Sequence, residues 1–109
     1  MPRLQKNIRD IESGWTLTEN SEMKSVVFYW RPGCGFCMSL QNQLSAANIP
    51  LEFRNIWEEP DAASFVRANA SGNEIVPTLS VGTTVLVNPS AGEVLDAMRE
   101  QVPHLIPAT

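Results

Sequence analysis

The two cysteines of the chain lie three positions apart in the segment Cys34-Gly35-Phe36-Cys37. Residues from Gly35 onward follow a helical pattern, which places Cys34 just before the first turn of a helix. Unpaired backbone N–H groups at that position stabilise a thiolate, and a thiolate attacks disulfide bonds. Cys37 lies about one turn later, within reach of the Cys34 sulfur. The motif therefore predicts thiol–disulfide exchange, with Cys34 as the more exposed attacking thiol and Cys37 as its buried partner.

Two inert core thiols and a metal site are the alternative interpretations of this motif. Only Cys37 fits the apolar face of the predicted helix, which argues against two inert thiols. The chain has a single histidine, His104. A zinc site with four ligands from one chain would therefore need Asp or Glu to complete it. We expect no metal to be bound by these cysteines.

Three residues outside the pair are candidates for binding a substrate. Arg31 lies three residues before Cys34 and could favour the thiolate or pair with a substrate carboxylate. A solvated arginine in a surface turn is the alternative. Phe36 can present an apolar surface beside the reactive sulfur. Ser90 begins the last predicted helix, where an anion could bind, and a plain helix cap is the alternative there.

The predicted elements place the cysteine motif between a buried strand and a helix. The run Ser25–Trp30 is continuously apolar and rich in β-branched and aromatic residues, which is typical of a central strand. The following helix, over residues 35–48, has one apolar face: Cys37, Leu40, Leu44 and Ala47. Further along we expect a strand over 51–56, a helix from Pro60 to about Ser71, strands over 74–81 and 84–87 with a turn at Gly82, and a helix from Ser90.

This order, β-α-β-α-β-β-α, predicts an α/β fold with a four-stranded mixed sheet flanked by helices. A helix connects the first two strands, so they should be parallel, whereas the closing hairpin is antiparallel. We expect an N-terminal extension over residues 1–22, either a short docked helix or a disordered arm. Residues 23–103 form the predicted domain, and residues 104–109 a C-terminal tail.

The composition limits the classes of partner. A chain of 109 residues, 43% hydrophobic and 18% charged, suits one folded domain. Its formal net charge of −4 gives no reason to expect nucleic acid or an anionic membrane as partner. No apolar run approaches the ~20 residues of a membrane span, and the first residues are polar where a signal peptide is apolar. We expect a cytoplasmic monomer.

With the cysteine motif followed by Val76-Pro77-Thr78 and Asn88-Pro89-Ser90, the chain resembles the glutaredoxins. It is most similar to the mycoredoxin-type glutaredoxins of actinobacteria, over roughly Ser25 to Gln101. The resemblance implies a thioredoxin fold, a cis bond at Pro77 facing the cysteines, and pairing of the Val76 backbone with the bound thiol substrate. It also implies reduction of mixed disulfides on protein substrates. The electron donor would be a small thiol, mycothiol or glutathione, with no bound cofactor.

Some residues depart from the mycoredoxin pattern. Trp30-Arg31-Pro32-Gly33 precedes the motif where mycoredoxins usually have small polar residues and a tryptophan. The tryptophan at position 30 resembles the pattern of thioredoxins. Thioredoxins, however, have a buried acid six residues before the first cysteine, and Phe28 occupies that position here. The Gly-Gly and Asp pattern of many glutathione-using glutaredoxins is missing near Asn88, which favours mycothiol. The alternatives are a thioredoxin-like protein disulfide reductase served by a flavin reductase, and a glutaredoxin that binds an iron–sulfur cluster between two protomers.

Overall fold

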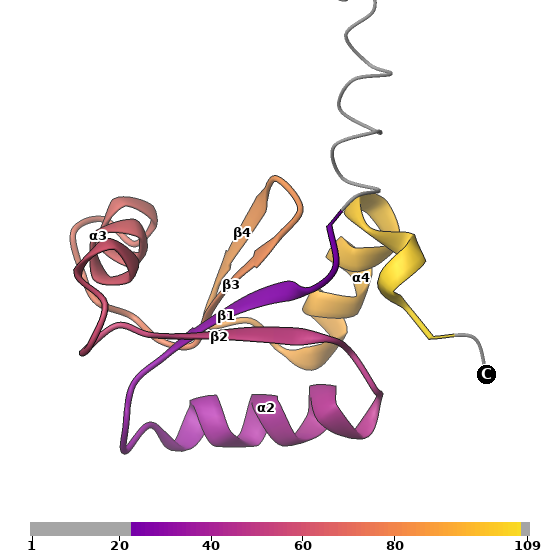
Figure 1. Ribbon diagram of the computed structural model, residues 1–109, viewed down its shortest axis with the longest axis horizontal. Coiled ribbons are helices and arrows are strands. Elements are labelled where there is room, and N and C mark those ends of the chain that lie inside the picture. The colour runs from indigo at the N-terminus through magenta and orange to yellow at the C-terminus, as the bar shows by residue number, and fades with distance from the viewer. Residues whose placement is uncertain (1–22, 108–109) are drawn as a thin grey trace, which may run out of the picture.

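The computed structural model describes residues 23–107, which form one four-stranded sheet with helices on its two faces (Figure 1). In chain order the elements are β1 (Val26–Trp30), α2 (Gly35–Ala46), β2 (Leu51–Asn55), α3 (Pro60–Asn69), β3 (Thr78–Val81), β4 (Thr84–Val87), α4 (Ala91–Gln101) and the 3-10 helix η1 (Pro103–Leu105). The predicted order of strands and helices is confirmed. The extension predicted over residues 1–22 lies outside the described residues. Among residues 23–107, no helix is both long and apolar enough to cross a membrane.

The sheet is mixed, with the strand order β2-β1-β3-β4. The first two strands run parallel, with Phe28 beside Phe53, because α2 connects them as a crossover. On its other side β1 pairs antiparallel with β3, and β3 pairs antiparallel with β4. The sequence-based prediction of a parallel first pair and an antiparallel hairpin is therefore confirmed. The order places β1, which leads into the cysteine motif, in the interior of the sheet.

Alternate residues along β1 contribute to two separate cores, because successive side chains of a strand point to opposite faces of the sheet. Val26 and Phe28 belong to the larger core, which includes apolar residues of α2 and α4. Tyr29 packs against the smaller core, which is made of Ile56 and the α3 residues Ala62, Ala63 and Val66. Helices α2 and α3 accordingly lie on opposite sides of the sheet (Figure 1).

Helix α2 is shorter than its sequence pattern suggests. Cys37, Leu40 and Leu44 are buried as predicted, at the spacing of one helical face. The helix ends at Ala46 rather than at Asn48, and Ala47 is its exposed C-cap residue. The prediction that Ala47 belongs to the buried face is therefore wrong, because the chain leaves the helical path there: Asn48 has a φ of 60°.

The strand predicted over residues 74–81 begins only at Thr78. Pro77 has no N–H to give to a strand ladder, and the residues before it leave the sheet. The Thr78 hydroxyl donates a hydrogen bond to the carbonyl of Ile75 at 2.8 Å, which stabilises a bend in place of the expected strand. The segment before β3 is therefore a loop.

Tyr29 connects β1 to α3. Its ring stacks on that of Phe65, with 4.8 Å between the centroids. Partial burial here raises the pKa of the Tyr29 phenol above its usual value, and the cation of Arg54 only partly offsets that effect.

The C-terminal residues of the described chain pack on the domain. Leu105 and Ile106 contact the larger core, and the His104 ring nitrogen Nε2 lies 2.8 Å from the carbonyl oxygen of Met23. This contact joins the two ends of the described chain.

Candidate active site

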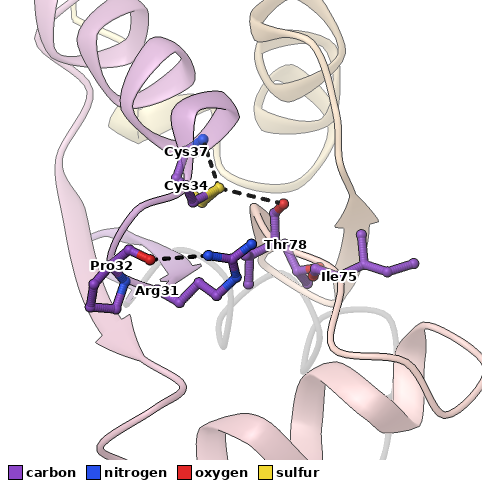
Figure 2. Close-up of a disulfide and its surroundings, with 7 residues drawn as sticks. Arg31, Pro32, Cys34, Cys37, Ile75 and Thr78 are labelled. Carbon is purple, nitrogen blue, oxygen red and sulfur yellow. Dashed lines mark hydrogen bonds between the residues drawn. A yellow bond between two sulfur atoms is a disulfide. The ribbon is translucent and has the colours of Figure 1, made fainter.

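Cys34 is the N-cap residue of α2, as the sequence predicts. Its backbone is extended, and its Sγ accepts a hydrogen bond from the N–H of Cys37 at 3.1 Å. This N–H is one of the groups that a helix start leaves without a backbone partner. The sulfur therefore lies where the first turn of the helix favours negative charge. In the structure Cys34 and Cys37 are joined as a disulfide (Figure 2).

The two cysteines are almost equally buried in this oxidised form. Cys37 is 2% exposed, which confirms its predicted place in the core, and Cys34 is 6% exposed. The expectation that Cys34 is the exposed member is therefore wrong for the disulfide. The bond holds its sulfur against the first turn of α2, where the loop before β3 also approaches it.

That loop contains the residues that the resemblance assigns to substrate binding. The Val76–Pro77 peptide bond is cis, which confirms the prediction, and the Val76 carbonyl oxygen lies 3.8 Å from the Cys34 Sγ. The N–H of Asn88 donates a hydrogen bond to the Pro77 carbonyl at 2.7 Å. Among the described residues, neither backbone group of Val76 pairs with another backbone group. Its N–H is thus open to an extended ligand, and its carbonyl lies beside the sulfur.

Arg31 and Phe36 lie on either side of Cys34 in the chain. Phe36 is 73% exposed on the first turn of α2, so it offers the apolar surface that we expected. The Arg31 guanidinium donates a hydrogen bond to the Pro32 carbonyl at 3.0 Å. Figure 2 shows this side chain reaching toward the segment of Ile75 and Thr78, on the far side of the disulfide from α2. Arg31 is therefore well placed to meet a ligand bound along that segment.

The sequence did not indicate Trp57 as part of this region. Its ring lies under the Arg31 guanidinium, 5.6 Å from the ring centroid to the Arg31 carbon Cζ. The N–H of Ile56 donates a hydrogen bond to the Trp30 carbonyl at 2.9 Å, which brings the ends of β1 and β2 together. No local pattern joins residues 31 and 57, so only the sheet pairing reveals the contact.

Ser90 caps α4. Its hydroxyl accepts from the N–H of Glu93 at 3.1 Å, and its own N–H donates to the Glu93 carboxylate at 2.8 Å. This is a complete capping box. The cap is thus present, and anion binding by Ser90 stays a prediction. Within residues 23–107, no three His, Cys, Asp or Glu side chains form a group that could hold a metal ion.

A sequence model of the glutaredoxin family matches residues 26–86, more than half of the chain. The chain belongs to the glutaredoxin family. Two Mycobacterium tuberculosis proteins, each named "Putative glutaredoxin" and from different strains, are 35% identical to this glutaredoxin over 71 residues. The matched region covers 64% of this chain and 84% of each relative.

Solved structures share the fold of this glutaredoxin. The buckwheat glutaredoxin–glutathione complex superposes with a TM-score of 0.53 at 17% identity, over 84% of each chain. The holo form of glutaredoxin C1 from Populus tremula x tremuloides gives 0.51 at 18% identity, over 89% of this chain and 96% of its own. A thioredoxin-like protein gives 0.60 at 15% identity, over 68% and 99%. This glutaredoxin therefore has a thioredoxin-like fold, and with its Cys34–Cys37 pair it is a thiol–disulfide oxidoreductase.

Proposed function

We propose that this glutaredoxin reduces mixed disulfides between proteins and mycothiol, with mycothiol also serving as the electron donor. One observation carries the proposal: the Cys34 Sγ lies between the N–H of Cys37 and the unpaired backbone of Val76. The first contact favours a thiolate at Cys34. The second offers a docking edge on which the cysteinyl part of a small thiol can lie in extended form.

The reduced enzyme begins with Cys34 as a thiolate. This thiolate attacks the mycothiol sulfur of the mixed disulfide, forming a new S–S bond to Cys34 and breaking the bond to the substrate protein. The electron pair of the broken bond leaves on the protein sulfur, which then takes up a proton. The substrate is now reduced, and mycothiol is attached to Cys34.

Two routes clear this intermediate. In the first, a second mycothiol thiolate attacks the bound mycothiol, releasing oxidised mycothiol and restoring the Cys34 thiolate. In the second, Cys37 attacks the Cys34 sulfur, releasing mycothiol and leaving the disulfide that the structure contains. Two further mycothiol molecules reopen that disulfide and leave as one oxidised dimer. The electron balance is the same by both routes.

The choice of thiol has separate support. The buckwheat neighbour is a complex with glutathione, which supports a small thiol as ligand of this fold. The relatives come from Mycobacterium tuberculosis, and the mycoredoxin resemblance implies mycothiol in place of glutathione. The segment at Asn88 also lacks the pattern typical of glutathione-using members.

The test compares three reductant systems on one protein mixed-disulfide substrate: mycothiol, glutathione, and thioredoxin reductase, each supplied with NADPH and the reductase that it requires. We expect kcat/KM to be at least about tenfold higher with mycothiol, a difference of about 1.4 kcal/mol in transition-state stabilisation. Higher turnover with glutathione would refute the choice of thiol. Turnover with thioredoxin reductase alone would instead support a thioredoxin-like role.

A further inference from the structure

Trp57 leaves a large aromatic surface open beside Arg31. It is 63% exposed, whereas tryptophan is highly buried on average. Its neighbour Ile56 is 4% exposed, so the turn after β2 places one apolar side chain in the core and the next one outside. An exposed indole of this kind marks a binding surface more often than a small exposed side chain does.

Two contacts order Trp57 without covering its ring. The backbone N–H of Trp57 donates a hydrogen bond to the side-chain oxygen of Asn55 at 2.9 Å, which orders the turn. The Arg31 guanidinium lies against the ring at 5.6 Å, a cation–π contact. The ring is therefore positioned before any ligand arrives, and less conformational entropy is lost on binding.

Arg31, which contacts the ring, lies three residues before the reacting Cys34. Arg31 belongs to the short turn between β1 and Cys34, and its side chain points toward the loop of Ile75 and Thr78 (Figure 2). The Arg31 guanidinium thus contacts the indole and reaches toward the loop that contains Val76, so a thiol bound along Val76 that meets this guanidinium also comes near the indole. The surface they meet combines a flat apolar face with guanidinium N–H donors.

A sugar ring suits such a surface. Its C–H groups form a flat apolar face that can pack on an aromatic ring, while the hydroxyl groups around its edge accept hydrogen bonds from a guanidinium. Mycothiol carries its acetylated cysteine on an amino sugar joined to inositol, whereas glutathione is a peptide. The two thiols thus have similar sulfur atoms, but the part of the molecule that would meet this surface is a sugar in mycothiol and a peptide in glutathione.

We propose that Trp57, positioned by Arg31, is a specificity-determining residue that binds the sugar part of mycothiol. This inference rests on the proposed function and deepens it. Trp57 contacts the bound thiol away from the sulfur, so it contributes to substrate binding and leaves the chemistry of the cysteines unchanged.

The test uses mixed disulfides of one protein with mycothiol and with N-acetylcysteine methylamide (the N-acetylcysteine substrate), which keeps the acetylated cysteine and its amide but lacks the amino sugar and the inositol. In the Trp57→Ala variant we expect KM for the mycothiol substrate to rise about tenfold, which corresponds to about 1.4 kcal/mol, because tryptophan is enriched among the residues that carry most binding energy. Its KM for the N-acetylcysteine substrate and both kcat values should match the unaltered protein. Trp57→Phe, which keeps an aromatic face, should retain most of the affinity.

An equal rise of KM for both substrates, or no rise at all, would overturn the inference. Thermal unfolding of Trp57→Ala serves as the control, and a Tm close to that of the unaltered protein is expected because the side chain is exposed. The two proposals fail separately. If the unaltered protein does not turn over the mycothiol substrate, the proposed function is wrong; if it does and Trp57→Ala shows no selective change, only the role of Trp57 is wrong.

Discussion

Cys34 and Cys37 differ in chemical surroundings more than in exposure. Both cysteines belong to the larger core, but Cys34 caps α2 and its sulfur accepts the Cys37 N–H, whereas Cys37 lies within the helix. The cap position stabilises a thiolate, and an apolar setting favours the protonated thiol. The residues therefore have unequal roles even though both are buried in the disulfide.

These unequal roles predict that substitution of the two cysteines affects activity to different extents. Cys34→Ser should show no activity on a mycothiol mixed disulfide, because it lacks the attacking sulfur. Cys37→Ser should retain substantial activity, because a second mycothiol molecule can clear the intermediate without Cys37. Steady-state turnover of both variants tests this. Full loss of activity in Cys37→Ser would favour the thioredoxin-like alternative, in which Cys37 must resolve every intermediate.

The Cys34 thiol should ionise at lower pH than a free cysteine. The start of α2 and the Cys37 N–H both stabilise the thiolate, so the pKa should lie below ~8.5. Activity that depends on the thiolate is then present above this lowered pKa and is lost as the pH falls through it. Alkylation rate against pH in Cys37→Ser, where Cys34 is the single thiol, measures the value. A midpoint at ~8.5 would contradict the prediction.

At the scale of elements, substitution of Ser90 at the start of α4 distinguishes a role in stability from a role in binding. Ser90→Ala removes the hydroxyl that accepts the Glu93 N–H, and loss of such a cap typically costs about 1 kcal/mol. We expect urea denaturation to show this loss and KM to stay unchanged. Ser90→Thr keeps a hydroxyl and is the matched control. A raised KM in Ser90→Ala, restored in Ser90→Thr, would instead support the predicted anion site.

The contact between β1 and α3 should make stability depend on alkaline pH. Burial raises the folded-state pKa of Tyr29, so above the unfolded value of about 10 the unfolded chain releases its proton first. Stability from the neutral phenol is therefore complete below that value and declines as the pH rises through the folded-state pKa.

Tyr29→Phe tests this dependence, because phenylalanine can keep the stacking on Phe65 without an ionisable group. The free energy of unfolding of the unaltered protein should fall more steeply above pH 10 than that of the variant. Tyr29 is the single tyrosine of the chain, so tyrosinate absorbance reports its ionisation directly. Parallel pH profiles for the two proteins would show that the partly buried phenol has no such effect.

At the scale of the whole molecule, the remaining alternative is a cluster shared between two protomers. We expect the protein, purified without oxygen, to be colourless and to sediment as a monomer of 12.1 kDa. A brown dimer that loses its colour in Cys34→Ser would support the iron–sulfur alternative.

Local sequence determined most of the fold and the reactive pair. Hydrophobic periodicity predicted the strands and helices in their observed order, and the place of Cys34 before α2 follows from residues within one turn of it. These features depend on neighbours in the chain, so a pattern of residues is enough to recognise them. The errors in the predicted elements lie at their boundaries. The helix α2 ends before Ala47, and the bend before Thr78 makes β3 begin later than periodicity alone predicts.

Only the tertiary structure decided what surrounds the cysteines. Val76 reaches the Cys34 sulfur from 42 residues away, and Trp57 meets Arg31 because β1 and β2 end side by side. The near-equal burial of Cys34 and Cys37 likewise depends on the approach of the loop before β3. Such contacts follow from strand pairing and packing between distant segments, and no local spacing encodes them. The local sequence thus determines the reactive cysteine pair, whereas the surface around it depends on the tertiary fold.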